Sequence, residues 1–128
     1  MVVAGLVLAA VAAIVHIFIF YLESVAWTGA RARSTFGTSE EDARTTKALA
    51  FNQGFYNLFL AIAVIIGIVL FALGATVAGA TLVFAGAGSM AAAALVLLIS
   101  SPDKASAALK QGVIPALGLI ALAIGLAL

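Results

Sequence analysis

Six polar residues interrupt stretches of this sequence that otherwise consist almost entirely of hydrocarbon side chains: His16, Glu23, Asn52, Gln53, Tyr56 and Asn57. A seventh, Gln111, stands at the start of the last apolar stretch. An ionisable side chain inside a membrane-spanning segment is costly and marks a candidate functional site. A carboxylate in a protected cavity can carry a proton or hold a cationic group, and amides and a phenol can orient a ligand. We therefore treat these seven residues as candidate ligand-binding residues.

The same residues also have a purely structural interpretation. Glu23 could reach the membrane surface and pair with Arg31 or Arg33, and Asn and Gln side chains often hold membrane helices together. His16 could be a hydrogen-bond partner of Asn52, Tyr56 or Asn57, and Tyr56 could donate to Glu23 or His16. The sequence leaves both interpretations open.

Composition indicates a membrane protein. Hydrophobic residues make up 66% of the 128 residues and charged residues only 9%, whereas typical soluble chains are about half apolar and about a quarter charged. The net charge of +1 gives no indication of nucleic-acid binding. No Cys is present, which excludes disulfides and thiol chemistry, and a single His with five carboxylates makes a metal site formed by this chain alone unexpected.

Four apolar runs are long enough to cross a bilayer, which takes roughly 20 residues per helix. We expect helices over about 2–23, 39–73, 77–99 and 111–128, forming one domain over 1–128. The first run has no basic residue at its start and contains His16, which argues against a cleaved signal peptide. The predicted fold is an all-α membrane protein, an antiparallel bundle of four transmembrane helices.

The basic residues predict the orientation of these helices. Arg31, Arg33, Arg44 and Lys47 lie between the first two runs, and Lys104 and Lys110 lie between the last two. Cytoplasmic loops carry an excess of Lys and Arg, so both connections should be cytoplasmic and both termini should face outward. In that orientation the seven polar residues fall in the cytoplasmic half of the bilayer, because His16 lies about 10 Å deeper than Glu23 at roughly 1.5 Å per helical residue.

Local signals refine the helix ends. Thr38 and Glu41 have the spacing of a capping box, and Glu40 precedes Arg44 by four residues, so the second helix should begin near Ser39 and continue unbroken into the membrane. Trp27 has the position of an interfacial anchor. Pro115 should lie in the first turn of the last helix, where proline costs little.

Small residues recur at helical spacing in the last two helices. Ala85, Ser89 and Ala93 form one stripe, and Gly118, Ala121 and Gly125 form another. Such stripes let helix backbones approach closely in lipid. The spacing does not distinguish packing within one chain from packing between chains.

The sequence resembles a family of small bacterial four-helix membrane proteins catalogued as domain of unknown function 1304. The resemblance is carried by the runs HIFIFYLE (16–23) and KALAFNQGFYNLFLA (47–61), by Trp27-Thr28 and Phe36-Gly37, and by Gln111-Gly112 with Pro115-Ala116. It spans nearly the whole chain, although the third helix matches only in character. Phe51 and Phe55 are bulkier than the family pattern, which leaves the pocket volume open. The resemblance implies a bacterial plasma-membrane protein and makes all seven polar residues signature positions. It implies no activity.

We expect an integral membrane protein that binds or transports a small amphiphilic molecule or a lipid at a polar pocket in the cytoplasmic half of the bilayer. The alternative is a structural or accessory subunit of a larger membrane complex. Membrane lipids are expected partners, a homo-oligomer remains open, nucleic acid is not expected, and no cofactor can be named.

Two more specific functions agree less well with the sequence. A small multidrug transporter would have a carboxylate in its first helix, but the one-sided charge opposes dual topology, and Glu23 lies too near the boundary for a midplane site. A four-helix glutathione-transferase type of enzyme would need Arg within the bundle, and no Arg lies within any of the four runs. No nucleophile with an adjacent base emerges, so we lean against an enzyme.

Overall fold

Four long helices carry most of the chain in the computed structural model, which describes all 128 residues. They are α1 (Val2–Phe20), α4 (Lys47–Ala72), α5 (Thr76–Ser100) and α6 (Ala105–Ala127). A π-helical turn (Tyr21–Val25) extends α1, two short helices, α2 (Ala30–Phe36) and α3 (Glu40–Thr45), precede α4, and a 3-10 turn (Pro102–Lys104) leads into α6. There is no strand, so the prediction of an all-α protein with four long helices is confirmed.

Each of the four helical segments is long and apolar enough to cross a membrane. The segment Val2–Val25 has a mean hydropathy of 2.8, and even the least apolar segment, Pro102–Ala127, reaches 1.8. Much of the outer surface consists of large apolar side chains such as Val3 and Val77, the latter 81% exposed. Such a surface fits an integral membrane protein, because lipid and not water must cover it.

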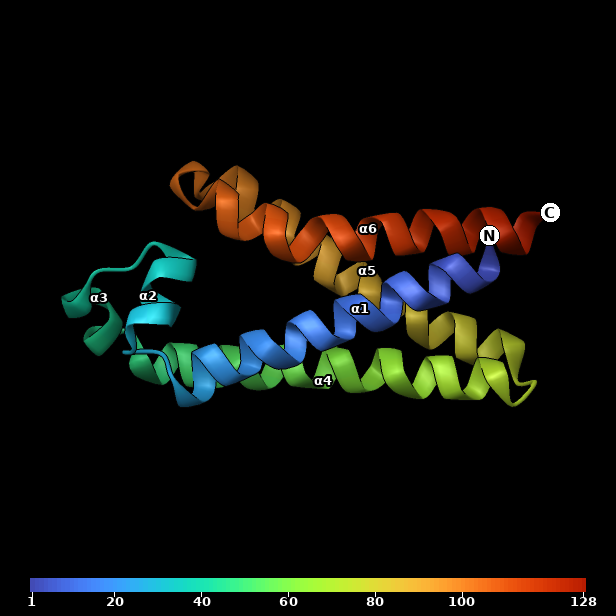
Figure 1. Cartoon of the computed structure of the whole chain (residues 1–128), viewed down its shortest axis with the longest axis horizontal. Coiled ribbons are helices and arrows are strands. Elements are labelled where there is room, and N and C mark those ends of the chain that lie inside the picture. Colours follow the sequence, from blue (N-terminus) through green and yellow to red (C-terminus); the bar gives the residue numbers. More distant parts are fainter.

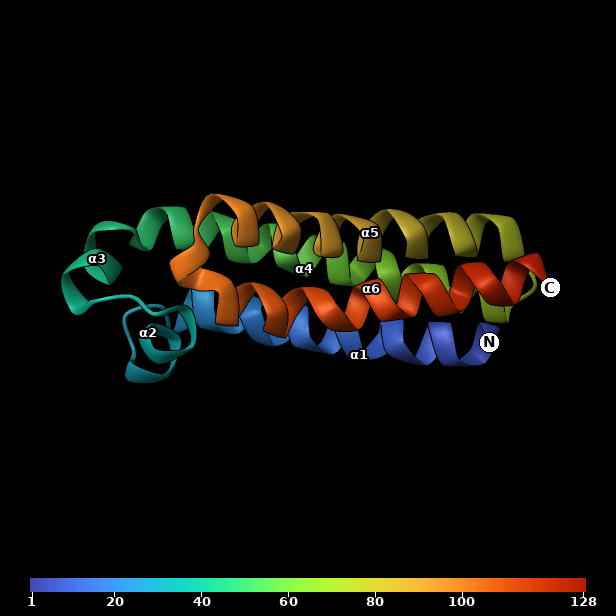
Figure 2. The ribbon, with the colours of Figure 1, turned by 90° about the horizontal axis from the view of Figure 1, so that it is seen from above.

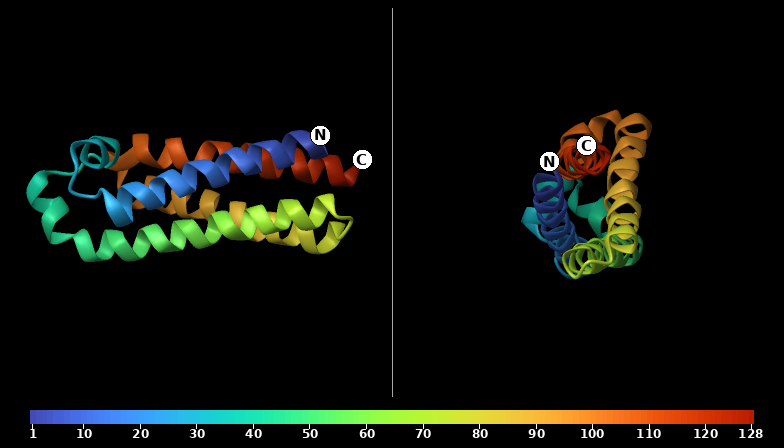
Figure 3. Two further views of the ribbon diagram at one scale, coloured as in Figure 1. Left: turned by 60° about the horizontal axis from the view of Figure 1, so that its bottom comes forward. Right: turned by 90° about the vertical axis from the view of Figure 1, so that its right-hand side faces the viewer.

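The long helices run antiparallel in chain order, so both termini and the α4–α5 turn lie at one end and the short helices α2 and α3 lie at the other (Figures 1 and 2). We call these the terminal end and the loop end. All charged side chains belong to residues within 23–47 and 103–110, and these segments lie at the loop end. In the end-on view, the four long helices lie around a common centre (Figure 3).

The helices exchange neighbours along the length of the molecule. At the terminal end α1 lies against α6, where a Cβ on Gly5 would come within 2.5 Å of the Leu122 backbone nitrogen. At the loop end α1 lies against α4 instead, and α5 moves from α4 toward α6 (Figure 1). The two pairs that face each other at the loop end are therefore α1 with α4 and α5 with α6.

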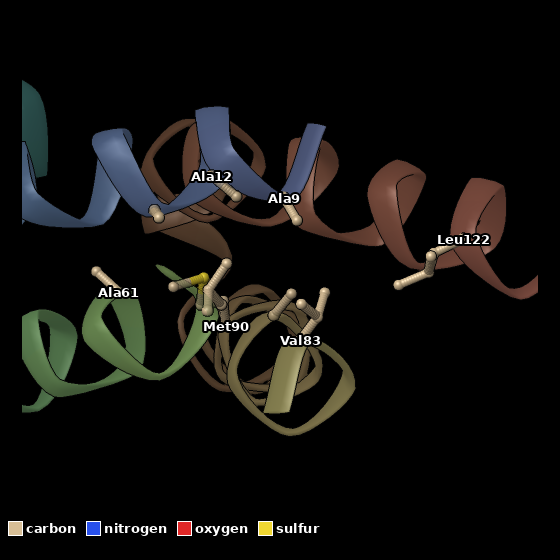
Figure 4. Close-up of a cluster of buried hydrophobic side chains, with 9 residues drawn as sticks. Ala9, Ala12, Ala61, Val83, Met90 and Leu122 are labelled. Atoms are coloured by element: carbon tan, nitrogen blue, oxygen red, sulfur yellow. The ribbon is translucent and has the colours of Figure 1, made fainter. Parts of the chain in front are cut away.

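The apolar core lies near the crossing of the four helices and is built mainly from alanine. Its nine buried residues are Ala9, Ala12, Ala13, Ala61, Val64, Val83, Ala87, Met90 and Leu122 (Figure 4). Small side chains allow the backbones to approach, so dispersion contacts between helices replace the hydrophobic effect that lipid does not supply. Beyond the core, at the terminal end, a second and mostly apolar recess of about 670 Å³ lies between the start of α5 and Leu126.

The two stripes of small residues behave differently. The stripe on α6 packs within the chain, because Gly118 and Ala121 are buried and Gly118 faces Ala9 of α1. The stripe on α5 does not, since Ala85, Ser89 and Ala93 are all exposed. A different face of α5, which includes Gly79, Val83 and Gly86, makes the contacts with α4.

The predicted helix over 39–73 is interrupted at Thr46, and its cap differs from the expected one. The Thr46 hydroxyl donates to the Asp42 carbonyl (2.6 Å) and accepts from the Trp27 indole (3.1 Å), so Thr46 joins α3 to the segment that follows α1. Ser39 caps α3, accepting from the Asp42 amide (3.1 Å), in place of the predicted Thr38 to Glu41 box. The predicted Glu40–Arg44 pair is present, with 3.8 Å between its charged atoms.

The last helix begins earlier than the predicted residue 111. The sequence from Ala105 to Lys110 is rich in good helix formers, and Pro102 stands at the start of the preceding 3-10 turn, so the chain is already helical before the apolar run. Pro115 therefore lies inside α6 and not in its first turn, which corrects the prediction. Without an N–H at residue 115, the Gln111 carbonyl lacks its helical donor.

Lys104 ties the two connections of the loop end together. Its ammonium donates to the carbonyls of Phe36 (2.9 Å) and Gly37 (2.8 Å), which lie at the end of α2. Gly37 ends this helix with φ 61°, a conformation that favours glycine. A cation at a helix C-terminus is favourable because the last carbonyls lack intrahelical donors.

We expect Lys104→Met to loosen α2. Hydrogen bonds to charged groups contribute about 1.5–3 kcal/mol, so amide exchange over residues 30–38 should accelerate by roughly tenfold or more in hydrogen-exchange mass spectrometry. Lys110→Met is the matched control, because Lys110 makes no hydrogen bond through its side chain and is exposed. Equal exchange in the two variants would contradict a tethering role for Lys104.

We expect Gly54→Ala to destabilise the protein. A Cβ at residue 54 would collide with the Ser24 hydroxyl and lie 3.1 Å from the Phe20 carbonyl oxygen, so overpacking should cost about 1–3 kcal/mol. Gly88→Ala is the control, since nothing lies within 4 Å of a Cβ there, and Ala should favour the helix by up to about 1 kcal/mol. Thermal unfolding in detergent, followed by circular dichroism, should therefore move the two midpoints in opposite directions. An unchanged midpoint for Gly54→Ala would mean that α1 and α4 are not held this close.

Candidate functional site

A cavity of about 780 Å³ occupies the loop end, where the α1–α4 and α5–α6 pairs face each other. Figure 1 shows these two pairs separating toward the loop end, with α2 and α3 beyond them. All seven sequence-predicted residues line this cavity: His16, Glu23, Asn52, Gln53, Tyr56, Asn57 and Gln111. Residues from three of the four long helices are thus brought to one place.

The π-helical turn places Glu23 in the cavity wall. Its backbone hydrogen bond runs from the Ala26 amide to the Tyr21 carbonyl (3.0 Å), five residues back, which widens the helix locally. The Ser24 hydroxyl donates to the Phe51 carbonyl on α4 (2.8 Å), so the turn is fixed to the neighbouring helix. Turns of this kind are frequent at functional sites.

Glu23 is buried and bonded to α4. Its side chain is 9% exposed, and its Oε2 accepts a hydrogen bond from Nδ2 of Asn57 (2.7 Å), itself 8% exposed. The alternative in which Glu23 reaches the surface and pairs with an arginine is wrong for this structure. Arg31 instead lies over the Phe18 ring, with 5.2 Å between its guanidinium carbon and the ring centroid.

His16 is the most deeply buried polar residue, with 2% of its surface exposed. Its Nδ1 lies 2.9 Å from the Ala12 carbonyl oxygen of its own helix. This corrects the idea that His16 bonds to Asn52, Tyr56 or Asn57. The other ring nitrogen, Nε2, makes no hydrogen bond to the protein, and the ring lines the cavity.

The remaining four predicted residues make no side-chain hydrogen bond within the protein. Asn52, Gln53 and Tyr56 are exposed on the α4 wall of the cavity, and Gln111 is half-buried on the α6 wall. Tyr56 does not donate to Glu23 or His16. Of the predicted polar cluster, the structure therefore joins only Glu23 and Asn57 directly across two helices.

Several lining residues were not predicted. The connection between α1 and α4 contributes Trp27, Phe36, Thr38, Asp42 and Thr46. Met90, Ala93 and Leu97 come from α5, and Ser101 follows its last residue. Trp27 was expected as an interfacial anchor, but its indole is bonded to Thr46 and its ring packs against Phe36. The capping signal near Ser39 could have indicated an ordered connection. Nothing in the apolar α5 sequence distinguishes a cavity wall from a lipid-facing wall.

The cavity lining has few charged side chains, and its carboxylates outnumber its lysines. Glu23 and Asp42 supply two carboxylates, and Lys104 supplies the one basic side chain of the lining, already engaged with two carbonyls. No group of three or more His, Cys, Asp or Glu side chains could hold a metal ion. A pocket that combines apolar side chains with convergent polar groups has the features of a small-molecule site.

The family comparison covers most of the chain. The family described as "Protein of unknown function (DUF1304)" matches residues 10–123, a range that contains every one of the seven polar residues. No curated protein and no solved structure matches the chain. With its four apolar helices, the match fits an integral membrane protein of unknown activity. The chain belongs to the DUF1304 family.

Proposed function

We propose that this protein binds or transports a small amphiphilic molecule or a lipid in the cavity at the loop end. The observation that carries the proposal is that seven polar side chains line one cavity while four of them lack any partner in the protein. Side chains that served only to hold helices together would be bonded to one another, because lipid offers no alternative partner. The cavity volume of about 780 Å³ lies in the usual range of small-molecule sites.

The polar and the apolar lining residues suit two different parts of the proposed ligand. Glu23, His16 and Asn57 form a buried polar end, which suits a head group. Leu49, Met90 and Leu97 form an apolar wall, which suits a hydrocarbon portion. Met90 belongs both to this wall and to the alanine-rich core, so it forms the floor of the cavity.

We also propose that the protein is a multi-pass protein of a bacterial plasma membrane, with its loop end in the cytoplasm. Every Lys and Arg lies at the loop end, and the turn at Gly74 and Ala75 carries none. The positive-inside rule therefore supports termini that face outward. In this orientation the cavity lies in the cytoplasmic half of the bilayer.

The orientation can be tested by labelling, because the chain has no cysteine of its own. Ala75→Cys in the α4–α5 turn should react with a membrane-impermeant maleimide in intact cells, whereas Ser34→Cys in α2 should react only after permeabilisation. Both positions are exposed, so each serves as the reactivity control for the other. The reverse pattern would refute the proposed topology, and labelling of both positions in intact cells would indicate mixed orientation.

The bound ligand should appear in native mass spectrometry of protein released from mild detergent. We expect the wild type to carry an extra mass of a small amphiphile and Glu23→Gln to lose at least about nine-tenths of it, which corresponds to roughly 1.4 kcal/mol or more. Glu41→Gln is the matched control, because Glu41 is exposed and does not line the cavity. Equal adducts, or none, in all three proteins would contradict the proposal.

The same spectra bear on a second candidate function, that of an accessory subunit of a larger membrane complex. The exposed stripe of Ala85, Ser89 and Ala93 on α5 favours it, because small residues that pack against no other helix of the chain permit close approach of another helix, although Ala93 also lines the cavity and Ala85 lines the terminal-end recess. Masses of two or more chains, or of a retained partner subunit, without any adduct that depends on Glu23, would favour this function over ligand binding.

A further inference from the structure

The buried end of the cavity has an unequal supply of hydrogen-bond donors and acceptors. The Ala12 carbonyl can only accept, so Nδ1 of His16 carries the proton of the neutral ring and Nε2 presents a lone pair. In Glu23, Oε2 accepts from Asn57 and Oε1 has no partner. Because Asn57 uses its Nδ2 toward Glu23, its Oδ1 is also left as a free acceptor.

Three acceptors therefore line the cavity: Oε1 of Glu23 and Oδ1 of Asn57, which lie together, and Nε2 of His16, which lies about two helical turns deeper. The only donor left on these three side chains is the second N–H of the Asn57 amide. The other amides of the lining, on Asn52, Gln53 and Gln111, carry donors and acceptors alike and do not discriminate. A head group that brings donors of its own would therefore satisfy the acceptors of Glu23 and Asn57.

The charges favour the same kind of head group. Two carboxylates, Glu23 and Asp42, line the cavity against one ammonium, that of Lys104, whose hydrogen bonds hold the end of α2. Arg31 is turned away onto Phe18, and no arginine lines the cavity. A buried carboxylate repels an anion and attracts a cation, most strongly where water is excluded.

The cavity lining adds aromatic rings to this arrangement. Trp27, Phe36 and Tyr56 are among its lining residues. The faces of such rings attract ammonium groups, with Trp the strongest. Trp27 and Phe36 follow the π-helical turn toward the loop end, so a cation entering from that end would pass them before it reaches Glu23.

We propose that the ligand of this cavity is a primary amine attached to an apolar chain. Its ammonium group would donate hydrogen bonds to Oε1 of Glu23 and Oδ1 of Asn57, and its hydrocarbon would lie along Leu49, Met90 and Leu97. This inference rests on the proposed function, since it names the chemical class of the molecule that the cavity binds. The buried carboxylate of Glu23 disfavours an anionic head group, because the two charges would repel each other.

The test uses the only tryptophan of the chain, Trp27, which lines the cavity. Its fluorescence should change saturably when the purified protein in mild detergent is titrated with hexylamine. Hexan-1-ol and hexanoate share the hydrocarbon but not the ammonium, and both should bind at least tenfold more weakly. Hexyltrimethylammonium keeps the charge but has no N–H, and it should also bind more weakly than hexylamine.

Glu23→Gln should weaken hexylamine binding by tenfold or more, and Glu41→Gln should bind it as the wild type does. Circular dichroism of each variant checks the fold, and the comparison of the four probes on wild-type protein does not depend on any variant. Hexanoate or hexan-1-ol binding as tightly as hexylamine would overturn the assignment to amines while leaving the cavity a binding site. The absence of saturation with every probe would also overturn it, and the native mass spectra then decide separately whether another molecule is bound.

Discussion

The structure depends on the contacts that each long helix makes with different neighbours at its two ends. Gly5 and Gly125 bring α1 and α6 together at the terminal end, and Gly54 brings α1 against α4 at the loop end. Because a helix is stiff, such a change of partner leaves space between pairs that face each other. Space arises at both ends, and only the side chains make the loop-end cavity polar and the terminal-end recess apolar.

The wall around Glu23 shows how this scaffold accommodates a carboxylate among hydrocarbon. Burying a charged or polar group is costly unless it is hydrogen-bonded, and Glu23 has a single protein partner, Asn57. The widened turn that carries it is fixed by Ser24 to the α4 backbone, directly beside Gly54. The absence of a side chain at residue 54 is thus a condition for the position of the carboxylate.

The number and extent of the long helices could be predicted from hydropathy, and the gathering of seven polar residues could be predicted from their depth. Two boundaries could not. The break at Thr46 coincides with hydrogen bonds from its hydroxyl group to Asp42 and from the Trp27 indole, and the second of these is a contact between segments that no local pattern reveals. Pro115 resembled a helix start, but α6 already begins at Ala105, because the six residues up to Lys110 are mostly good helix formers although they lie outside the predicted apolar run. The contribution of α5 to the cavity wall could not be predicted either, because alanine and leucine residues give the same sequence pattern whether they face lipid or a cavity.

The position of Met90 at the floor of the cavity has a consequence for the permeability of the membrane. Beyond this floor the bundle is closed by Ala9, Ala12, Val64, Val83 and their neighbours in the core, with no polar side chain among them. An ion that entered the polar cavity would meet a layer of tightly packed hydrocarbon before it reached the other surface, and such a layer is a high electrostatic barrier. A bundle in this conformation would admit a molecule from one side and still keep the membrane electrically sealed.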